Sequence, residues 1–344
     1  MAVHTSEDSV AQAAAHQGEN TPHRRMTWER FALLVMAKYG TVVALVGMIA
    51  AFSIADPGLF LTTSNIVNIL GQIAIIGVIA SGLTIGLAAG VFDLSVGYVA
   101  SFAGVLVTGL MVNQHLPIPA AIVVTLASCA GIGLVNGLIV TKTGVNSFIA
   151  TLGVGTVVIG GNFAYNSGVA VALGVPDSFL KINLTKVIGI PLPVFITIGI
   201  VLVLWILLNR TVFGNNVQAV GGNADAALLA GVRVDRVQIY ALVTSSLCAG
   251  AGGIMLASKL GSGQTTAADS YLLTAFAAAF LGSVALRDAE FHIIGTVIGV
   301  VTVGVVFNGL SIIGADTFYQ YVANGGLLVM AVAMSTVARR LAAR

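Results

Sequence analysis

A carboxylate and a hydroxyl group two residues apart, Asp93 and Ser95, stand between two long apolar stretches, in the segment GVFDLSVG at 90–97. A charged side chain at the centre of a bilayer costs roughly 2.5–3.5 kcal/mol on insertion scales, so an acidic residue at that depth is typical of a functional site. The flanking glycines permit a break in the helix. Two interpretations follow: a tight turn with Asp93 in an N-cap position, or a break that lines a permeation route.

Neutral amide side chains recur in or beside the apolar stretches, and Asn136 and Asn308 are two of them. Hydrogen-bonding groups without charge suit an uncharged polyhydroxylated solute better than an ion, although asparagine also holds membrane helices together. We therefore predict a translocation path lined by Asp93, Ser95, Asn136 and Asn308, with interhelical packing as the alternative role for the asparagines.

Motifs of bond-making chemistry are missing from the sequence. It contains no GxxxxGK[ST] phosphate loop and no HExxH, GxSxG or Cys/His cluster. The two cysteines, Cys129 and Cys248, lie in apolar stretches and lack metal-ligand spacing. The sequence predicts no enzyme, no cofactor and no metal site, so a transporter of this kind must draw its energy from another component.

The composition of the chain indicates which kind of structure positions the candidate route residues. Of 344 residues 57% are hydrophobic and only 8% are charged, the mean hydropathy is +1.00, and a globular protein carries about 25% charged residues. We predict an all-α, polytopic membrane helical bundle embedded in lipid. A net charge of +2 without a basic stripe argues against nucleic acid as a partner.

Three regions follow from the polarity of the chain. Residues 1–30 are polar and lack the apolar core of a signal peptide, which predicts a disordered cytosolic arm. Residues 31–338 form the predicted transmembrane domain, and 339–344 a cytosolic tail. About ten apolar runs are long enough to cross roughly 30 Å of hydrocarbon, although Val194–Leu208 and Tyr271–Leu286 are short, so that one could be a half-span or bent. The ten runs are Phe31–Ala55, Ile66–Ala89, Ser95–Val112, Ile118–Val140, Phe148–Tyr165, Val194–Leu208, Val237–Ser258, Tyr271–Leu286, His292–Ile313 and Phe318–Val337.

The lysines and arginines predict the orientation. If both termini are cytoplasmic, twelve of the 15 basic residues lie on the cytosolic side, and only Lys181, Lys186 and Lys259 lie outside. Positive charge is retained on the cytosolic side of such proteins, so this bias favours an even number of spans.

Glycine spacing and a short repeated sequence motif bear on the architecture. Gly295 and Gly299 are four apart on a predicted span, a spacing that allows close helix packing in lipid. VNGL at 135–138 and FNGL at 307–310 end the fourth and ninth runs, which point in opposite directions in a ten-span arrangement. The recurrence of this motif predicts an inverted repeat, a common transporter architecture. A chance match of four residues is the alternative.

The longest polar interruption after the N-terminal arm is the loop Asn209–Arg236. Within it Asn223 is placed to cap a short helix over 224–230, with Asp225 in its first turn and Gly231 at its stop. A helix this short is not stable alone in water. The helix either lies on the bilayer surface or docks to a cytosolic partner, and the residues themselves favour neither.

Five segments together carry a family resemblance. The chain resembles the inner-membrane permeases of bacterial ATP-binding-cassette importers for ribose, xylose and related monosaccharides, over about 59–337. The matching segments are SGLTIGLAAGVFDLSVG (81–97), SFIATLGVGTVVIGG (147–161), AVGGNADAALLAGVRVDRVQIY (219–240), GSGQTTAADSYLLTAFAAAFLGS (261–283) and IIGTVIGVVTVGVVFNGLSIIG (293–314).

The resemblance implies a role and a set of partners. The partners are a cytosolic ATP-binding-cassette ATPase, a periplasmic sugar-binding protein and a second permease copy, in a homodimer or heterodimer. The cargo would be a monosaccharide or related polyol. The short helix would then be the ATPase-coupling site, formed by Gly222, Asn223, Asp225, Ala227, Leu228 and Gly231.

One segment departs from the family pattern, and two other functions stay open. Where such permeases often carry a turn of the type GGTSLxGGxG, this chain reads GSVALRDAE at 282–290, a difference that concerns its contact with the ATPase. Branched-chain amino-acid permeases share the broader superfamily. The main alternative is a secondary transporter driven by an ion gradient, with Asp93 as the coupling carboxylate. A membrane receptor or scaffold without transport activity is the second.

Overall fold

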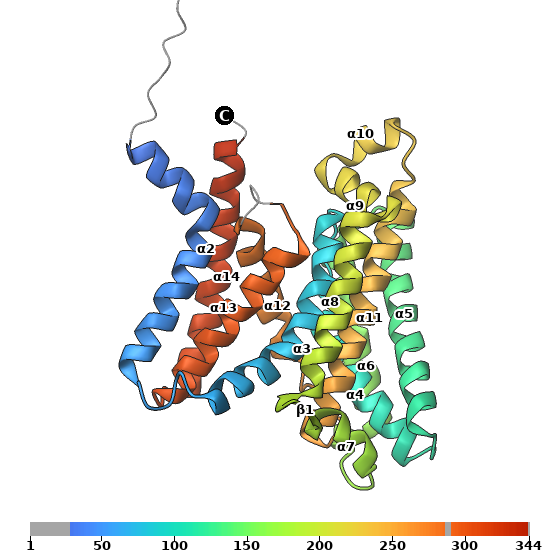
Figure 1. Cartoon of the computed structure of the whole chain (residues 1–344). Coiled ribbons are helices and arrows are strands. Elements are labelled where there is room, and N and C mark those ends of the chain that lie inside the picture. Colours follow the sequence, from blue (N-terminus) through green and yellow to red (C-terminus); the bar gives the residue numbers. More distant parts are fainter. Residues whose placement is uncertain (1–27, 286–289, 343–344) are drawn as a thin grey trace, which may run out of the picture. The chain divides into compact units, whose positions relative to one another are not determined.

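The computed structural model describes residues 28–285 and 290–342 (Figure 1). Most of the predicted N-terminal arm, most of the loop Arg287–Glu290 and the last two residues of the predicted tail lie outside the described residues. The chain divides into two compact units, Met1–Met36 and Ala37–Arg344. Of the first, only the opening turns of helix α2 are described, and the following paragraphs concern the second.

The regular secondary structure of the described residues is helical apart from one hairpin and an isolated bridge between Val171 and Gly263. Strands β1 (Lys186–Val187) and β2 (Ile190–Pro191) pair antiparallel, with Lys186 opposite Pro191. The helices are α2 (Trp28–Ala55), α3 (Thr63–Ala88), α4 (Val96–Val112), α5 (Ile118–Thr143), α6 (Ser147–Asn166), α7 (Asp177–Leu184), α8 (Leu192–Arg210), α9 (Val212–Gly222), α10 (Ala224–Leu229), α11 (Val234–Leu260), α12 (Asp269–Val284), α13 (Ile293–Ile312) and α14 (Thr317–Ala342).

Each predicted apolar run coincides with one of these helices. Within the described residues, six helices are long and apolar enough to cross a membrane, namely α3, α5, α6, α8, α11 and α13. Gly40–Ala55, α4 and α12 are shorter apolar helices. The chain is therefore an all-α, polytopic membrane protein, as predicted, while ten crossings and the inverted repeat remain predictions.

Small residues set the packing of the helices. Helix α11 packs against α3, α4 and α5, and α12 packs against α13 and α14. A Cβ on Gly253 of α11 would overlap the backbone carbonyl of Ala100 on α4, and one on Gly299 of α13 would overlap that of Ala278 on α12. Such backbone contact gives helices in lipid their van der Waals attraction, because burying apolar groups gains little there. The predicted packing role of Gly299 is confirmed.

Two short helices, α4 and α12, each follow a non-helical segment that packs against a neighbouring helix. In the first segment, 89–95, the Phe92 N–H donates to Ser147 Oγ (3.0 Å) and the Leu94 N–H to Thr151 Oγ1 (2.9 Å), both on α6. A Cβ on Gly155 of α6 would lie 3.3 Å from Ser95 Cα. Ser95, just before α4, therefore lies beside Gly155, eight residues after the start of α6 at Ser147. Since a helix rises 1.5 Å per residue, α4 begins about 12 Å from the start of α6, measured along the α6 axis.

The second segment, 261–268, is similarly fixed. Val171 and Gly263 exchange two backbone hydrogen bonds of 2.9 Å. The Ala268 N–H donates to Ser101 Oγ (3.0 Å), which itself donates to Asp269 Oδ1 (2.9 Å). Helix α12 therefore starts beside the second turn of α4. Of the two runs predicted to be short, α12 is the one that is a short helix, whereas α8 has the length to cross a membrane.

Candidate functional site

The polar loop 209–236 contains two short helices, α9 and α10, at one end of α8 and α11, while α7 and the hairpin lie at the other (Figure 1). The Ala226 N–H donates to Asn223 Oδ1 (2.9 Å), so Asn223 is the N-cap of α10, as predicted. Gly231 follows the helix with φ +84°, and its predicted role as the stop is also confirmed. The helix ends at Leu229, one residue before the predicted end.

The two faces of α10 differ in character. Ala227 is only 5% exposed and packs into the apolar core, whereas Leu228 is 60% and Leu229 is 90% exposed. Asp225 is exposed in the first turn. The helix thus presents a pair of apolar side chains that are largely uncovered by the described chain. Leu229 was missing from the predicted coupling residues, although its position two residues after the inward-facing Ala227 is a usable signal.

Helix α9, which is part of this loop, contacts the chain where α3 ends and the non-helical segment 89–95 begins. This segment is called the break before α4. Helix α3 ends at Ala88, and Gly90 follows the C-cap residue Ala89 with φ +76°, in the left-handed region that favours glycine. A Cβ on Gly221 of α9 would overlap the Ala88 carbonyl oxygen, and a Cβ on Gly90 would lie 3.6 Å from Gly221 Cα. Backbone meets backbone here, so α9 and the break are in direct contact.

Three of the four predicted route residues form one buried chain of hydrogen bonds. Asp93 Oδ1 accepts bonds from the Ser95 N–H (3.0 Å) and the Ser95 hydroxyl, and Ser95 Oγ accepts one from Asn136 Nδ2 (2.9 Å) on α5. All three side chains are fully buried. Asp93 thus bends the backbone before α4, as in the tight-turn interpretation. Ser95, not Asp93, occupies the N-cap position.

Asn308 lies in a separate contact. On α13 its Nδ2 donates to Asn65 Oδ1 (2.8 Å) on α3, and Asn65 Nδ2 donates back to Asn308 Oδ1 (3.0 Å). Asn65 Nδ2 also donates to the Phe60 carbonyl (2.8 Å). The two amides satisfy each other, which is the interhelical role that the sequence left open for asparagine.

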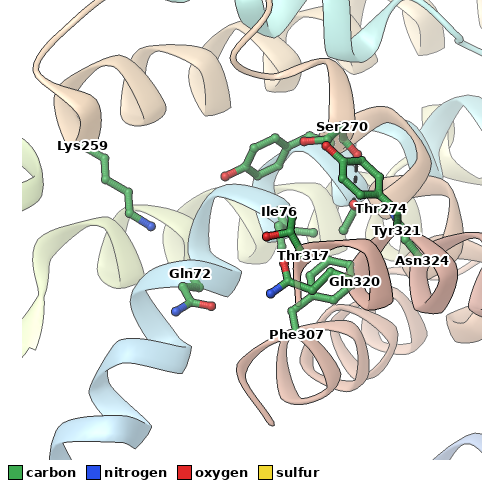
Figure 2. Close-up of a pocket in the computed structure, with 11 residues that line it drawn as sticks. Gln72, Ile76, Lys259, Ser270, Thr274, Phe307, Thr317, Gln320, Tyr321 and Asn324 are labelled. Carbon is green, nitrogen blue, oxygen red and sulfur yellow. Dashed lines mark hydrogen bonds between the residues drawn. The ribbon is translucent and has the colours of Figure 1, made fainter. Parts of the chain in front are cut away.

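A cavity of about 250 Å³ lies among α3, α11, α12, α13 and α14 (Figure 2). None of the four predicted route residues lines it, although Phe307, the neighbour of Asn308, does. Figure 2 shows Gln72 and Lys259 on the opposite side of the cavity from Tyr321 and Asn324. The lining is mostly polar or aromatic: Gln72, Ile76, Lys259, Ser270, Tyr271, Thr274, Phe307, Thr317, Gln320, Tyr321 and Asn324.

Sequence reasoning missed this cavity because five helices contribute to it. One signal was present: Gln320 and Asn324 stand four apart at the start of an apolar run, and so do Ser270 and Thr274. Polar residues at that spacing share one face of a helix. Cavities of drug-sized ligands span roughly 300–1,000 Å³, so this smaller one suits a small solute.

Comparisons with known proteins show what the chain as a whole is similar to. A family described as "Branched-chain amino acid transport system / permease component" matches residues 65–332. The ribose import permease protein RbsC of Bacillus subtilis (strain 168) is 38% identical over 299 residues, covering 87% of this chain and 92% of the relative. The L-arabinose ABC transporter permease protein AraH of Azospirillum brasilense is 36% identical (85% and 86% covered), and the D-allose transport system permease protein AlsC of Escherichia coli (strain K12) is 32% identical (86% and 91% covered). No solved structure matches the chain.

Proposed function

The chain belongs to the branched-chain amino acid transport system permease component family, and on that premise we propose that it is the membrane subunit of an ATP-binding-cassette importer for a monosaccharide or related polyol. It is a transport component and not an enzyme. Similarity to ribose, arabinose and allose permeases over at least 84% of its length carries this proposal. As a multi-pass protein of this family, it resides in the bacterial inner membrane.

Helix α10 is the proposed contact with the cytosolic ATPase. Two exposed leucines on a capped helical turn suit an apolar groove in a partner, since removing apolar surface from water favours association. Leu228 and Leu229 would enter that groove, while Ala227 seats the helix on its own chain. The other predicted coupling residues shape the element: Asn223 and Gly231 define its ends, Asp225 interacts with its N-terminal dipole, and Gly222 leaves open space beside it.

The contact between α9 and the break offers a path for force. A push on α10 would reach Gly221 and then the backbone at 88–90, which leads into the break and α4. Asp93, Ser95 and Asn136 tie that break to α5, so the movement would pass to the helices around it. We assign these three residues, together with Asn308, to holding the walls of the translocation route. The step is a gating motion of the alternating-access type.

Topology and symmetry follow as parts of the same proposal. Ten crossings with both termini cytoplasmic would place α10 in the cytosol and α7 in the periplasm. The series α2, α3, break, α4, α5, α6 and the series α8, α11, break, α12, α13, α14 would be the two inverted halves. This pairing is supported by the position of the short helices α4 and α12, each preceded by a non-helical segment. Interrupted helices in corresponding positions are typical of transporters with inverted repeats.

The complete importer would contain further components. A second permease copy, in a homodimer or heterodimer, would complete the pore within the lipid. A periplasmic sugar-binding protein would deliver the solute at the end where α7 lies, opposite α10.

Reconstitution tests the proposal. The permease, its ATPase and its binding protein would be placed in proteoliposomes, and uptake of labelled ribose, arabinose and allose followed with ATP inside and an ionophore present. We expect uptake that requires ATP and survives collapse of ion gradients. Uptake that follows a proton or sodium gradient without ATP would instead support a secondary transporter with Asp93 as its coupling group.

A further inference from the structure

One buried amide in the cavity has an unused hydrogen-bond acceptor. Asn324 on α14 is 7% exposed, and its Nδ2 donates to Thr274 Oγ1 (3.1 Å) on α12. Within the described parts of the chain, no group bonds to its Oδ1. A buried polar atom without a partner costs free energy, so each one in a native protein calls for an explanation.

The hydrogen bonds around Asn324 settle which way its amide points. The Thr274 hydroxyl uses its one hydrogen to donate to the Ser270 carbonyl (3.0 Å). Its oxygen can therefore only accept from Asn324, which must present its NH₂ group and not its oxygen. The carbonyl oxygen of Asn324 is left for another donor.

The remaining lining indicates what that donor is. Amides and hydroxyls predominate, and the rings of Phe307, Tyr271 and Tyr321 supply flat apolar surface. The lining residues include no carboxylate, so the ammonium group of an amino acid would find no counter-charge among them. The one charged lining residue, Lys259, can donate hydrogen bonds from its ammonium group to sugar hydroxyl oxygens. A sugar hydroxyl, which both donates and accepts, matches this mixture.

The place of the cavity in the fold agrees with this. Ser270 and Thr274 belong to the first turns of α12, the short helix that starts beside α4. Interrupted membrane helices commonly border the solute sites of transporters.

We propose that this cavity is a binding subsite for a neutral monosaccharide, in which one sugar hydroxyl donates a hydrogen bond to Asn324 Oδ1 while the sugar ring lies against the aromatic side chains. The inference rests on the proposed import function and names the site within the permease that recognises a hydroxyl group of the sugar.

The test is an Asn324→Leu variant, which keeps the size of the side chain and removes both amide atoms. In the reconstituted importer with ATP, uptake of ribose is compared with uptake of its monodeoxy analogues, for the wild type and the variant. The binding protein contributes equally to the wild type and the variant. A change in the ratio of ribose uptake to analogue uptake between the two therefore reports on the permease alone. The matched control is Asn162→Leu on α6, since Asn162 is 1% exposed and also has an unpartnered Oδ1 but does not line the cavity.

We expect the wild type to take up one deoxy analogue about two- to tenfold more slowly than ribose, which is the effect of losing one hydrogen bond. The Asn324→Leu variant should take up that analogue and ribose at the same rate. The Asn162→Leu variant should keep the wild-type preference. Unchanged discrimination in Asn324→Leu, or its loss in Asn162→Leu as well, would overturn the subsite while leaving the import function intact. If the wild type shows ATP-dependent uptake of leucine and of no sugar, both the sugar assignment and the subsite fail.

Discussion

Gly221 on α9 lies directly against the backbone carbonyl of Ala88 at the end of α3, with no space for a side chain between them. This contact joins the loop that carries α10 to the break before α4. It is therefore the place where a movement of α10 would enter the membrane helices.

Replacing Gly221 with alanine should weaken the coupling. The added methyl group would overlap the Ala88 carbonyl, and overpacking of this kind costs roughly 1–3 kcal/mol. We expect α9 to move away from the break, so that less solute is taken up per ATP hydrolysed. Measuring uptake and hydrolysis in the same proteoliposomes checks this. The control is Gly131→Ala on α5, where an added methyl group meets no other atom. An unchanged ratio in Gly221→Ala would refute the assigned path.

The variant Leu229→Asp should detach the ATPase. Leu229 is 90% exposed on α10, so the substitution leaves the permease fold unaffected. Burying a leucine side chain contributes roughly 1.5–3 kcal/mol, so its loss should weaken binding at least about tenfold. Co-purification with the ATPase reports the effect. Leu173→Asp is the matched control, because Leu173 is 91% exposed in the loop before α7, at the opposite end.

The variants Ala227→Arg and Leu228→Arg should each abolish uptake, for two different reasons. Ala227 is buried, so Ala227→Arg displaces α10 from its own chain, whereas Leu228→Arg places a charge on the docking face. Both variants should insert into the membrane normally. Proteolysis of the loop in the isolated permease should increase only in Ala227→Arg. Wild-type transport by either variant would count against α10 as the coupling element.

The amide pair between α3 and α13 should act as a structural link. Asn65→Leu or Asn308→Leu alone leaves one buried amide without its partner, whereas the double variant removes both. We expect each single variant to unfold at a lower temperature than the wild type, and the double variant to recover part of the loss. Pairs of this kind in membranes contribute about 0.6–1.7 kcal/mol. Thermal unfolding in detergent measures it, and strictly additive losses would show that the two amides act independently.

Asp93→Asn separates the two transport mechanisms. Asparagine keeps the oxygen that accepts from Ser95, so the bend before α4 is preserved. We expect ATP-driven uptake to persist, because no proton or cation needs to bind residue 93. Abolished uptake, combined with normal membrane insertion and normal ATPase binding, would support a carboxylate that couples transport to an ion gradient.

The sequence alone determined the features that depend on short stretches of chain. Each apolar run was recognisable because a membrane span satisfies its own backbone hydrogen bonds and is long enough by itself. The cap at Asn223 and the stop at Gly231 were predictable for the same reason, since both bond to groups within a few residues. Family membership also followed from contiguous segments.

Only the tertiary structure decided which polar groups meet. Asn308 and Asn136 read alike in the sequence, yet one pairs with Asn65, 243 positions away, and the other with Ser95 beside Asp93. The cavity combines residues of five helices, and the free oxygen of Asn324 depends on a hydroxyl 50 positions away. Helices in lipid associate through close packing and individual hydrogen bonds, without a strong hydrophobic pattern, so their partners leave little trace in the order of residues.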